Sequence, residues 1–162
     1  MIFMMKIRLL KEKDRERLHN ILTATHIFTS EEVGVAMELI DIVLREPNHK
    51  DYTVHCLVDD KDQPLGYICY GRAPMTQGTY DLYWIAVDPR FRNRGIGSRL
   101  VDFLEETVKG IGGRMIIVET SSTSSYDMTQ EFYRHKGFQE VGRVPGYYYP
   151  GNDRVTYCRR LL

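Results

Sequence analysis

The sequence predicts a mixed α/β protein built on one sheet with helices packed against it. An aromatic and β-branched segment at 80–87 has strand character, and the segment that begins at Ile96 repeats apolar residues at helical spacing. A further apolar strand is expected at 114–120. Because a helix separates the two strands, they are predicted to run parallel within one sheet.

The segment that precedes this unit is predicted to contain a strand and two helices. A strand near 5–9 leads to a first helix, for which Asp14 is the expected N-cap. Thr29 and Glu32 match a capping box at the start of the second helix, and Pro47 ends it. The expected buried faces are Leu18, Ile21 and Leu22 on the first helix and Val33, Ala36, Met37, Ile40 and Leu44 on the second.

The remaining strands are expected in two pairs that short polar turns connect. The first pair is 52–58 with 65–70, and the second is 140–147 with 155–160. The two turns are expected at 59–62 and 150–153. A helix that contains Tyr133 is expected between the two pairs, capped within Ser122–Ser125, and Gly110–Gly113 is expected to close the helix before it.

Length, charge and cysteine content limit the class of protein. A chain of 162 residues suits one domain, and its 22 basic residues balance 22 acidic ones, so no nucleic acid or membrane partner is expected. The first ten residues are too short and too charged for a signal peptide or a membrane span. The cysteines are expected to be buried thiols in the reducing cytoplasm, and the five histidines show no metal-ligand spacing. The cysteines are Cys56, Cys69 and Cys158.

The turn Arg92–Ser98, between the 80–87 strand and the next helix, has the features of an anion site. Gly95 and Gly97 let the backbone approach a ligand, and the first helical turn presents unpaired N–H groups to it. Arginines 90, 92, 94 and 99 add positive charge. These features favour a pyrophosphate, although glycines also serve packing alone in such turns. The G-x-G-x-x-G and Walker motifs of nucleotide-binding proteins are both absent.

Two motifs resemble those of the GNAT superfamily of N-acetyltransferases. One is Trp84-Ile-Ala-Val-Asp-Pro followed by Arg92-x-x-Gly95-x-Gly97 and a helix, and the other is F-Y-x-x-x-G-F at Phe132–Phe138. The resemblance implies a single domain over 1–162, with a core near 80–140 that binds acetyl-CoA. It also implies a mostly antiparallel sheet of six to seven strands, about four helices and a central parallel pair. The implied reaction moves an acetyl group from acetyl-CoA to a primary amine of a small metabolite or a peptide, and a homodimer is compatible with it.

The same resemblance assigns candidate residues for acetyl-CoA. The main chain of Ile85, Ala86 and Val87 would bind the pantetheine arm, and the turn residues Arg92, Asn93, Arg94, Gly95, Ile96, Gly97 and Ser98 would bind the pyrophosphate. Tyr133 would donate a proton to the departing thiolate, because a phenol titrates near 10 and a thiol near 8.5. Tyr126 stands where many members carry an asparagine that touches the pantetheine. A structural role beside Phe132 is the alternative for Tyr133.

Two carboxylates are candidates for the base that deprotonates the amine. Asp81 lies on the 80–87 strand, and Glu119 lies near the C-terminal end of 114–120, where ligands of α/β sheets collect. The structural alternatives are a strand-end hydrogen bond for Asp81 and a pairing with an arginine or Thr120 for Glu119. Tyr147–Tyr149 are candidates for the mouth of the acceptor site. Two other functions stay open: a noncatalytic acyl-CoA-binding module and a protein for another phosphate ligand.

Overall fold

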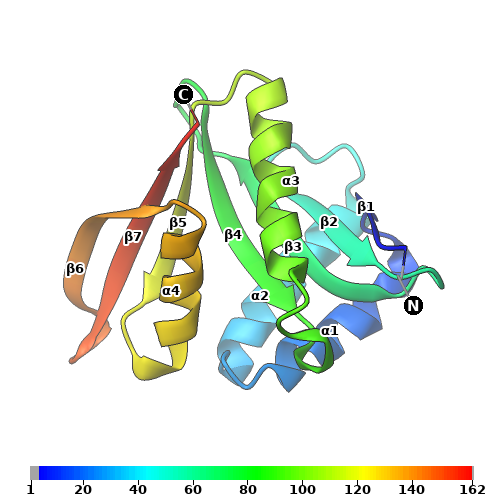
Figure 1. Cartoon of the computed structure of the whole chain (residues 1–162), viewed down its shortest axis with the longest axis horizontal. Helices are drawn as coiled ribbons and strands as arrows, with labels where there is room; N and C mark the ends of the chain where they lie inside the picture. The colour runs from blue at the N-terminus through cyan, green and yellow to red at the C-terminus, as the bar shows by residue number, and fades with distance from the viewer. Residues whose placement is uncertain (1–3, 162) are drawn as a thin grey trace. The chain divides into compact units, whose positions relative to one another are not determined.

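The computed structural model describes residues 4–161, which form seven strands and four α-helices (Figure 1). The sheet is mixed, as the sequence predicts, and its strands follow the order β1-β2-β3-β4-β5-β7-β6. The strands are β1 (Lys6–Leu9), β2 (Thr53–Val58), β3 (Pro64–Arg72), β4 (Thr79–Val87), β5 (Met115–Ser121), β6 (Gln139–Tyr149) and β7 (Asn152–Arg160). The helices are α1 (Arg15–Ala24), α2 (Ser30–Arg45), α3 (Ile96–Gly110) and α4 (Asp127–His135).

The described chain falls into two compact units, and β3, β4 and α3 each contribute residues to both. The first unit comprises residues 4–71 and 84–103, and the second comprises 72–83 and 104–161.

In the first unit, the antiparallel strands β1, β2 and β3 carry helices on both faces (Figure 1). Val54 and Cys56 of β2 and Tyr67 of β3 belong to the core that buries the predicted apolar faces of α1 and α2. The opposite face receives the first turns of α3. A Cβ on Gly66 would lie 2.9 Å from the Ala86 carbonyl oxygen and 3.1 Å from Ile96, so a larger residue here would force β4 or α3 away from β3.

The helix caps of this unit agree with the sequence at α2 and differ from it at α1. The Thr29 hydroxyl accepts the Glu32 N–H at 3.1 Å, and Glu32 accepts the Thr29 N–H at 2.6 Å, which confirms the capping box. Asp14 does stand at the N-cap of α1, but its side chain makes no cap hydrogen bond. Its buried carboxylate instead accepts two hydrogen bonds from Arg8, at 2.7 and 3.0 Å, which makes a charge-assisted pair.

In the second unit, the start of β4 pairs in parallel with β5 over Thr79–Asp81, as predicted, and β7 pairs antiparallel with both β5 and β6. The predicted cap of α4 within 122–125 is wrong. A 3₁₀ turn at Ser124–Tyr126 comes first, and Tyr126 precedes α4 without a side-chain cap. The last two strands also extend further than predicted, so that Pro150 and Gly151 alone separate them.

Two sequence expectations concern the whole described chain. All three cysteines are buried and free, as predicted. A search of residues 4–161 finds no helix that is long and apolar enough to cross a membrane.

Candidate active site

The turn between β4 and α3 keeps two residues in left-handed backbone conformation. Asn93 has φ 60° and Gly95 has φ 75°. The Arg99 N–H donates to the Gly95 carbonyl at 3.0 Å, so Gly95 is the last residue before the helical amides begin. Within residues 4–161, and apart from Gly95 and its two chain neighbours, no heavy atom lies within 4 Å of the place where a Gly95 Cβ would stand. The turn therefore leaves room for an anion beside the N-terminal amides of a 15-residue helix, where phosphates bind.

Asp88 fixes the start of this turn. It is buried, its N–H donates to the Leu65 carbonyl at 2.8 Å, and its carboxylate accepts the Arg90 N–H at 2.9 Å. It also pairs with Arg90 at 2.9 Å and with Arg17 of α1. Burial raises the pKa of Asp88, but the hydrogen bonds from Arg90 and Arg17 outweigh it, so the pKa falls to about 2. The sequence shows Asp88 only as a charge near the arginines, because its partner Arg17 is remote along the chain.

Three of the four arginines near the turn keep their charge available. Arg90 is neutralised by Asp88. Arg92 and Arg99 donate to main-chain carbonyls, those of Thr25 at 3.4 Å and Met5 at 3.2 Å. Arg94 lies over the Phe91 ring, 5.2 Å from its centroid. Among the residues that the structure describes, none of these three arginines forms an ion pair, so the turn carries net positive charge toward solvent.

The last residues of β4 lie just before this turn. Ile85, Ala86 and Val87 are C-terminal to the ladder with β5, which covers Thr79–Asp81. Ala86 is buried, and Ile85 and Val87 are partly exposed. The family resemblance assigns the main chain of these residues to the pantetheine arm.

Tyr133 lies in a buried cluster of aromatic side chains in the second unit. Its side chain is 2% exposed, and its ring lies 5.4 Å from both Phe132 and Phe138 and 6.2 Å from Tyr157. Burial raises the pKa of Tyr133 well above 10, so the hydroxyl keeps its proton at any physiological pH. The contact with Phe132 is the one expected of a structural role, and a protonated phenol is also what a proton donor requires.

The glycine of the second motif, F-Y-x-x-x-G-F, ends helix α4. Gly137 has φ 84°, and the Phe138 N–H donates to the Tyr133 carbonyl at 3.0 Å, which is the hydrogen bond of a glycine C-cap. A Cβ on Gly137 would also meet the guanidinium of Arg159 at 3.1 Å. The glycine therefore ends α4 one turn beyond Tyr133 and turns Phe138 back against its ring.

A polar network that the sequence does not reveal holds α4 on the sheet. The Tyr157 hydroxyl donates to the Gln130 side chain at 3.0 Å and accepts from Arg134 at 3.0 Å. The Gln130 amide donates to the Ser121 carbonyl at 3.0 Å. These bonds fix the side of α4 that carries Tyr133. The only signal in the sequence is one-turn spacing between Gln130 and Arg134.

The two candidate bases lie on neighbouring strands of the second unit. Asp81 pairs in register with Ile117, two residues before Glu119 on β5, so both carboxylates are on one face of the sheet. Burial, and then the charge of Glu119, raises the pKa of Asp81. The contacts expected if these carboxylates had only structural roles are also present, and both are long. The Tyr83 hydroxyl donates to Asp81 at 3.5 Å, and Arg154 Nε lies 3.9 Å from Glu119.

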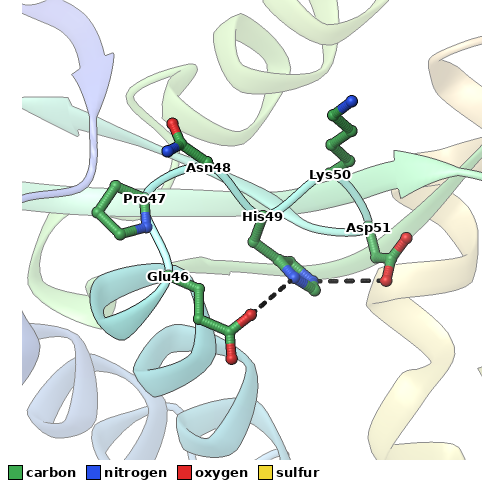
Figure 2. A pocket seen from close by; sticks show the side chains of 6 residues that line it. All are labelled: Glu46, Pro47, Asn48, His49, Lys50 and Asp51. Carbon is green, nitrogen blue, oxygen red and sulfur yellow. Dashed lines mark ion pairs between the residues drawn. The ribbon is translucent and has the colours of Figure 1, made fainter.

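A surface pocket of about 440 Å³ lies elsewhere, on the loop after α2. Figure 2 shows His49 between two carboxylates, with Glu46 3.4 Å from Nδ1 and Asp51 3.7 Å from Nε2. The His49 ring also stacks on Tyr52 at 5.3 Å. Within residues 4–161, no three His, Cys, Asp or Glu side chains are placed to hold a metal ion. None of the candidate site residues predicted from the sequence lines this pocket.

Comparison with known proteins places these motifs in a family. The model of the acetyltransferase (GNAT) domain matches residues 51–140, which is more than half of the chain. The crystal structure of a putative GNAT acetyltransferase from Desulfovibrio desulfuricans is 34% identical, with a TM-score of 0.93 over 98% of this chain and 100% of the other. A crystal structure of aminoglycoside 6′-N-acetyltransferase complexed with coenzyme A has the same fold, with 20% identity and a TM-score of 0.72 over 97% of each chain.

A curated relative has an assigned reaction but matches over a shorter segment. S-(2-succino)cysteine N-acetyltransferase from Bacillus subtilis strain 168 is 30% identical over 73 residues, which are 45% of this chain and 44% of that protein. The match thus spans less than half of the relative's length. The family model, and the agreement of the whole chain with the Desulfovibrio structure, lead to one conclusion: this chain belongs to the GNAT acetyltransferase family.

Proposed function

We propose that the protein is an N-acetyltransferase that moves an acetyl group from acetyl-CoA to a primary amine of a small metabolite or a peptide by direct attack on the thioester. The observation that carries the proposal is the β4–α3 turn of a GNAT family member, where open space at Gly95 adjoins helical amides and three uncompensated arginines. We take the chain to act as a single domain, with the core near 80–140. A cytoplasmic location agrees with its three free, buried thiols.

In the first unit, the turn 92–98 fits the pyrophosphate of coenzyme A. Main-chain N–H groups at the start of α3 would bind the phosphate oxygens, and Arg92 and Arg94 would add charge. The main chain of Ile85–Val87 would bind the amides of the pantetheine arm, as one strand binds another. An N–H of the same segment would donate to the thioester oxygen as negative charge develops there.

In the second unit, we assign the proton transfers to Tyr133 and a carboxylate. The amine nitrogen forms a bond to the acetyl carbon, and the C–S bond breaks with its electron pair on sulfur. Tyr133 would give its proton to that thiolate, since the buried phenol is protonated before the reaction. Asp81 or Glu119 would take the proton that the ammonium must lose, directly or through water.

The assigned acceptor of the Bacillus relative is a substituted cysteine, a small amino acid. The N-alpha-acetyltransferase RimI of Mycobacterium tuberculosis, 36% identical, matches over a longer segment of 90 residues, so the proposal keeps both the small-metabolite and the peptide branch.

Ligand binding separates this function from that of another phosphate-binding protein. Acetyl-CoA is expected to raise the melting temperature, whereas NAD and ATP are not. The Gly95→Ala variant should bind acetyl-CoA about tenfold more weakly or worse, because its methyl group would stand where the phosphate approaches. Gly112→Ala is the matched control, since Gly112 also has positive φ, 80°, and nothing within 4 Å. Stabilisation by ATP alone would overturn the proposal.

A further inference from the structure

One face of the second unit gathers charged side chains from three strands. Asp81 pairs in register with Ile117, Glu119 with Thr156, and Ser121 with Arg154, so Asp81, Glu119 and Arg154 all project from the same face. Tyr157, which alternates with Arg154 and Thr156 along β7, points to the other face and bonds to Gln130 and Arg134 of α4. The charged face is therefore the one that α4 leaves uncovered.

Arg154 is held on this face without a hydrogen bond. Its guanidinium lies over the Tyr147 ring, 4.4 Å from the centroid, and its side chain is only 29% exposed. Nε is buried and has no hydrogen-bond acceptor within residues 4–161, and it forms only a long ion pair, 3.9 Å, with Glu119. Within residues 4–161, the Arg154 guanidinium donates no hydrogen bond. Arg143, on the adjacent strand, shows the usual arrangement, with carboxylates at 3.0 and 3.1 Å.

A guanidinium that donates no hydrogen bond within the protein is suited to bind an anion. Buried polar groups in folded proteins are nearly always hydrogen-bonded, and an unsatisfied one lowers stability. The guanidinium offers donors in a planar fork that matches a carboxylate, and stacking on Tyr147 fixes its plane in advance. Glu119 is too distant for a hydrogen bond and is half exposed, so a ligand carboxylate can take the donors that Glu119 leaves unused.

The neighbouring charges indicate what else the ligand carries. Glu119 lies beside Arg154, and Asp81 lies one strand further along the same face. This places negative and positive groups next to each other, as a ligand with both an ammonium and a carboxylate requires. We propose that the acceptor amine carries a carboxylate, as a free amino acid does, and that Arg154 binds this carboxylate while Glu119 and Asp81 face the ammonium. The inference rests on the proposed acetyl transfer and specifies its acceptor class.

Other amines fit this face less well. A polyamine or an aminoglycoside carries only positive charge, which Arg154 would repel. The N-terminal residue of a peptide has its carboxyl group in an amide bond, so it offers no charge to the guanidinium. The carboxylate is therefore the group whose removal tests the inference.

The experiment compares amino acids with their carboxamides as acceptors. Thiol release from acetyl-CoA is measured for the common L-amino acids, each beside its amide and its decarboxylated amine. With wild-type protein, kcat/KM is expected to be about 10²-fold higher for the best acid than for its amide, as befits a bidentate charged pair. Arg154→Met should reduce this ratio to near one, chiefly through KM, and Arg154→Lys should retain an intermediate ratio. Arg143→Met removes a nearby positive charge whose partners lie within the chain, and it should leave the ratio unchanged.

The possible outcomes distinguish failure of the carboxylate site from failure of the proposed acetyl transfer. Equal kcat/KM for acids and amides in wild-type protein would overturn the carboxylate site, and this comparison requires no variant to fold. An acid preference that survives Arg154→Met would also overturn it. Efficient acetylation of polyamines, aminoglycosides or peptides, with no preference for amino acids over their amides, would contradict the carboxylate site and leave the proposed function intact. If bound acetyl-CoA were transferred to no amine at all, the proposed function itself would fail.

Discussion

Arg17 of α1 forms an ion pair with Asp88, the buried residue that follows β4. The same carboxylate accepts the N–H and the side chain of Arg90, so it links α1 to the start of the β4–α3 turn. A carboxylate with these partners sets the path of the chain into the turn before any ligand binds.

The Asp88→Asn substitution is expected to destabilise the protein. The carboxylate would lose its ion pairs with Arg17 and Arg90, and its lowered pKa corresponds to about 2 kcal/mol of stability at neutral pH. Because the folded state lowers the pKa of Asp88 to about 2, its contribution is present above the ordinary aspartate pKa of about 3.9 and is lost as the pH falls toward 2. Urea unfolding of both proteins at pH 7 and near pH 2.5 measures the difference.

Asp41→Asn provides the control for this prediction. Asp41 pairs with Arg15 at 2.6 Å, but the pair is exposed, so its loss should have a much smaller effect. Equal destabilisation by the two substitutions at pH 7 would show that Asp88 has no special role.

The Tyr67→Phe substitution is expected to stabilise the protein slightly. The Tyr67 side chain is fully buried, and its hydroxyl has no hydrogen-bond partner within residues 4–161. Removing an unsatisfied buried hydroxyl should increase the free energy of unfolding by about 1 kcal/mol. Differential scanning calorimetry would detect the rise in melting temperature. A fall would mean that the hydroxyl has a partner after all, such as a bound water.

The Asp81→Asn substitution should also raise stability at neutral pH. Burial and the nearby Glu119 raise the pKa of Asp81, so ionisation of this carboxyl is less favourable in the folded state than in the unfolded chain. The gain should be present at pH 7 and fade below about pH 4, where the carboxyl is protonated in both states. Melting temperatures across this range would show a constant difference if another effect were responsible.

The same variant helps to identify the base. Asp81→Asn and Glu119→Gln are compared by kcat/KM with one acceptor, and the variant that lacks the base should lose about 10²-fold or more. Retention of full activity by both variants would contradict the assignment of the base to this face.

The mixed sheet and the helix positions were predictable because local patterns determine them. Apolar periodicity located α1–α3, and the capping box at Thr29 located the start of α2. The parallel pairing of β4 with β5 followed from the helix between them. Each of these inferences used residues that are close together in the sequence.

The errors and omissions arise from contacts between distant residues. Asp14 looked like a helix cap, but Arg8 binds its carboxylate and removes it from that role. Arg17 and Asp88 are 71 positions apart, and no local pattern connects them. Arg154 resembled any strand arginine until the register showed its neighbours to be Glu119 and the Tyr147 ring. Charged side chains bind over long sequence separations, so only the folded chain reveals their partners.

Thiol release by the Tyr133→Phe variant is the most direct test of the proposed acetyl transfer and of the role of Tyr133 in it. Wild-type protein should release free thiol from acetyl-CoA only when a suitable amine is present, with the acetylated amine as the other product. Tyr133→Phe should bind acetyl-CoA normally but lower kcat by about 10²-fold, because the thiolate would leave without a proton donor. Tyr67→Phe, which removes the hydroxyl of another buried tyrosine, should leave kcat unchanged. Unchanged turnover by Tyr133→Phe would contradict the role of this hydroxyl, and a wild-type protein that binds acetyl-CoA but acetylates no amine would contradict the enzyme itself.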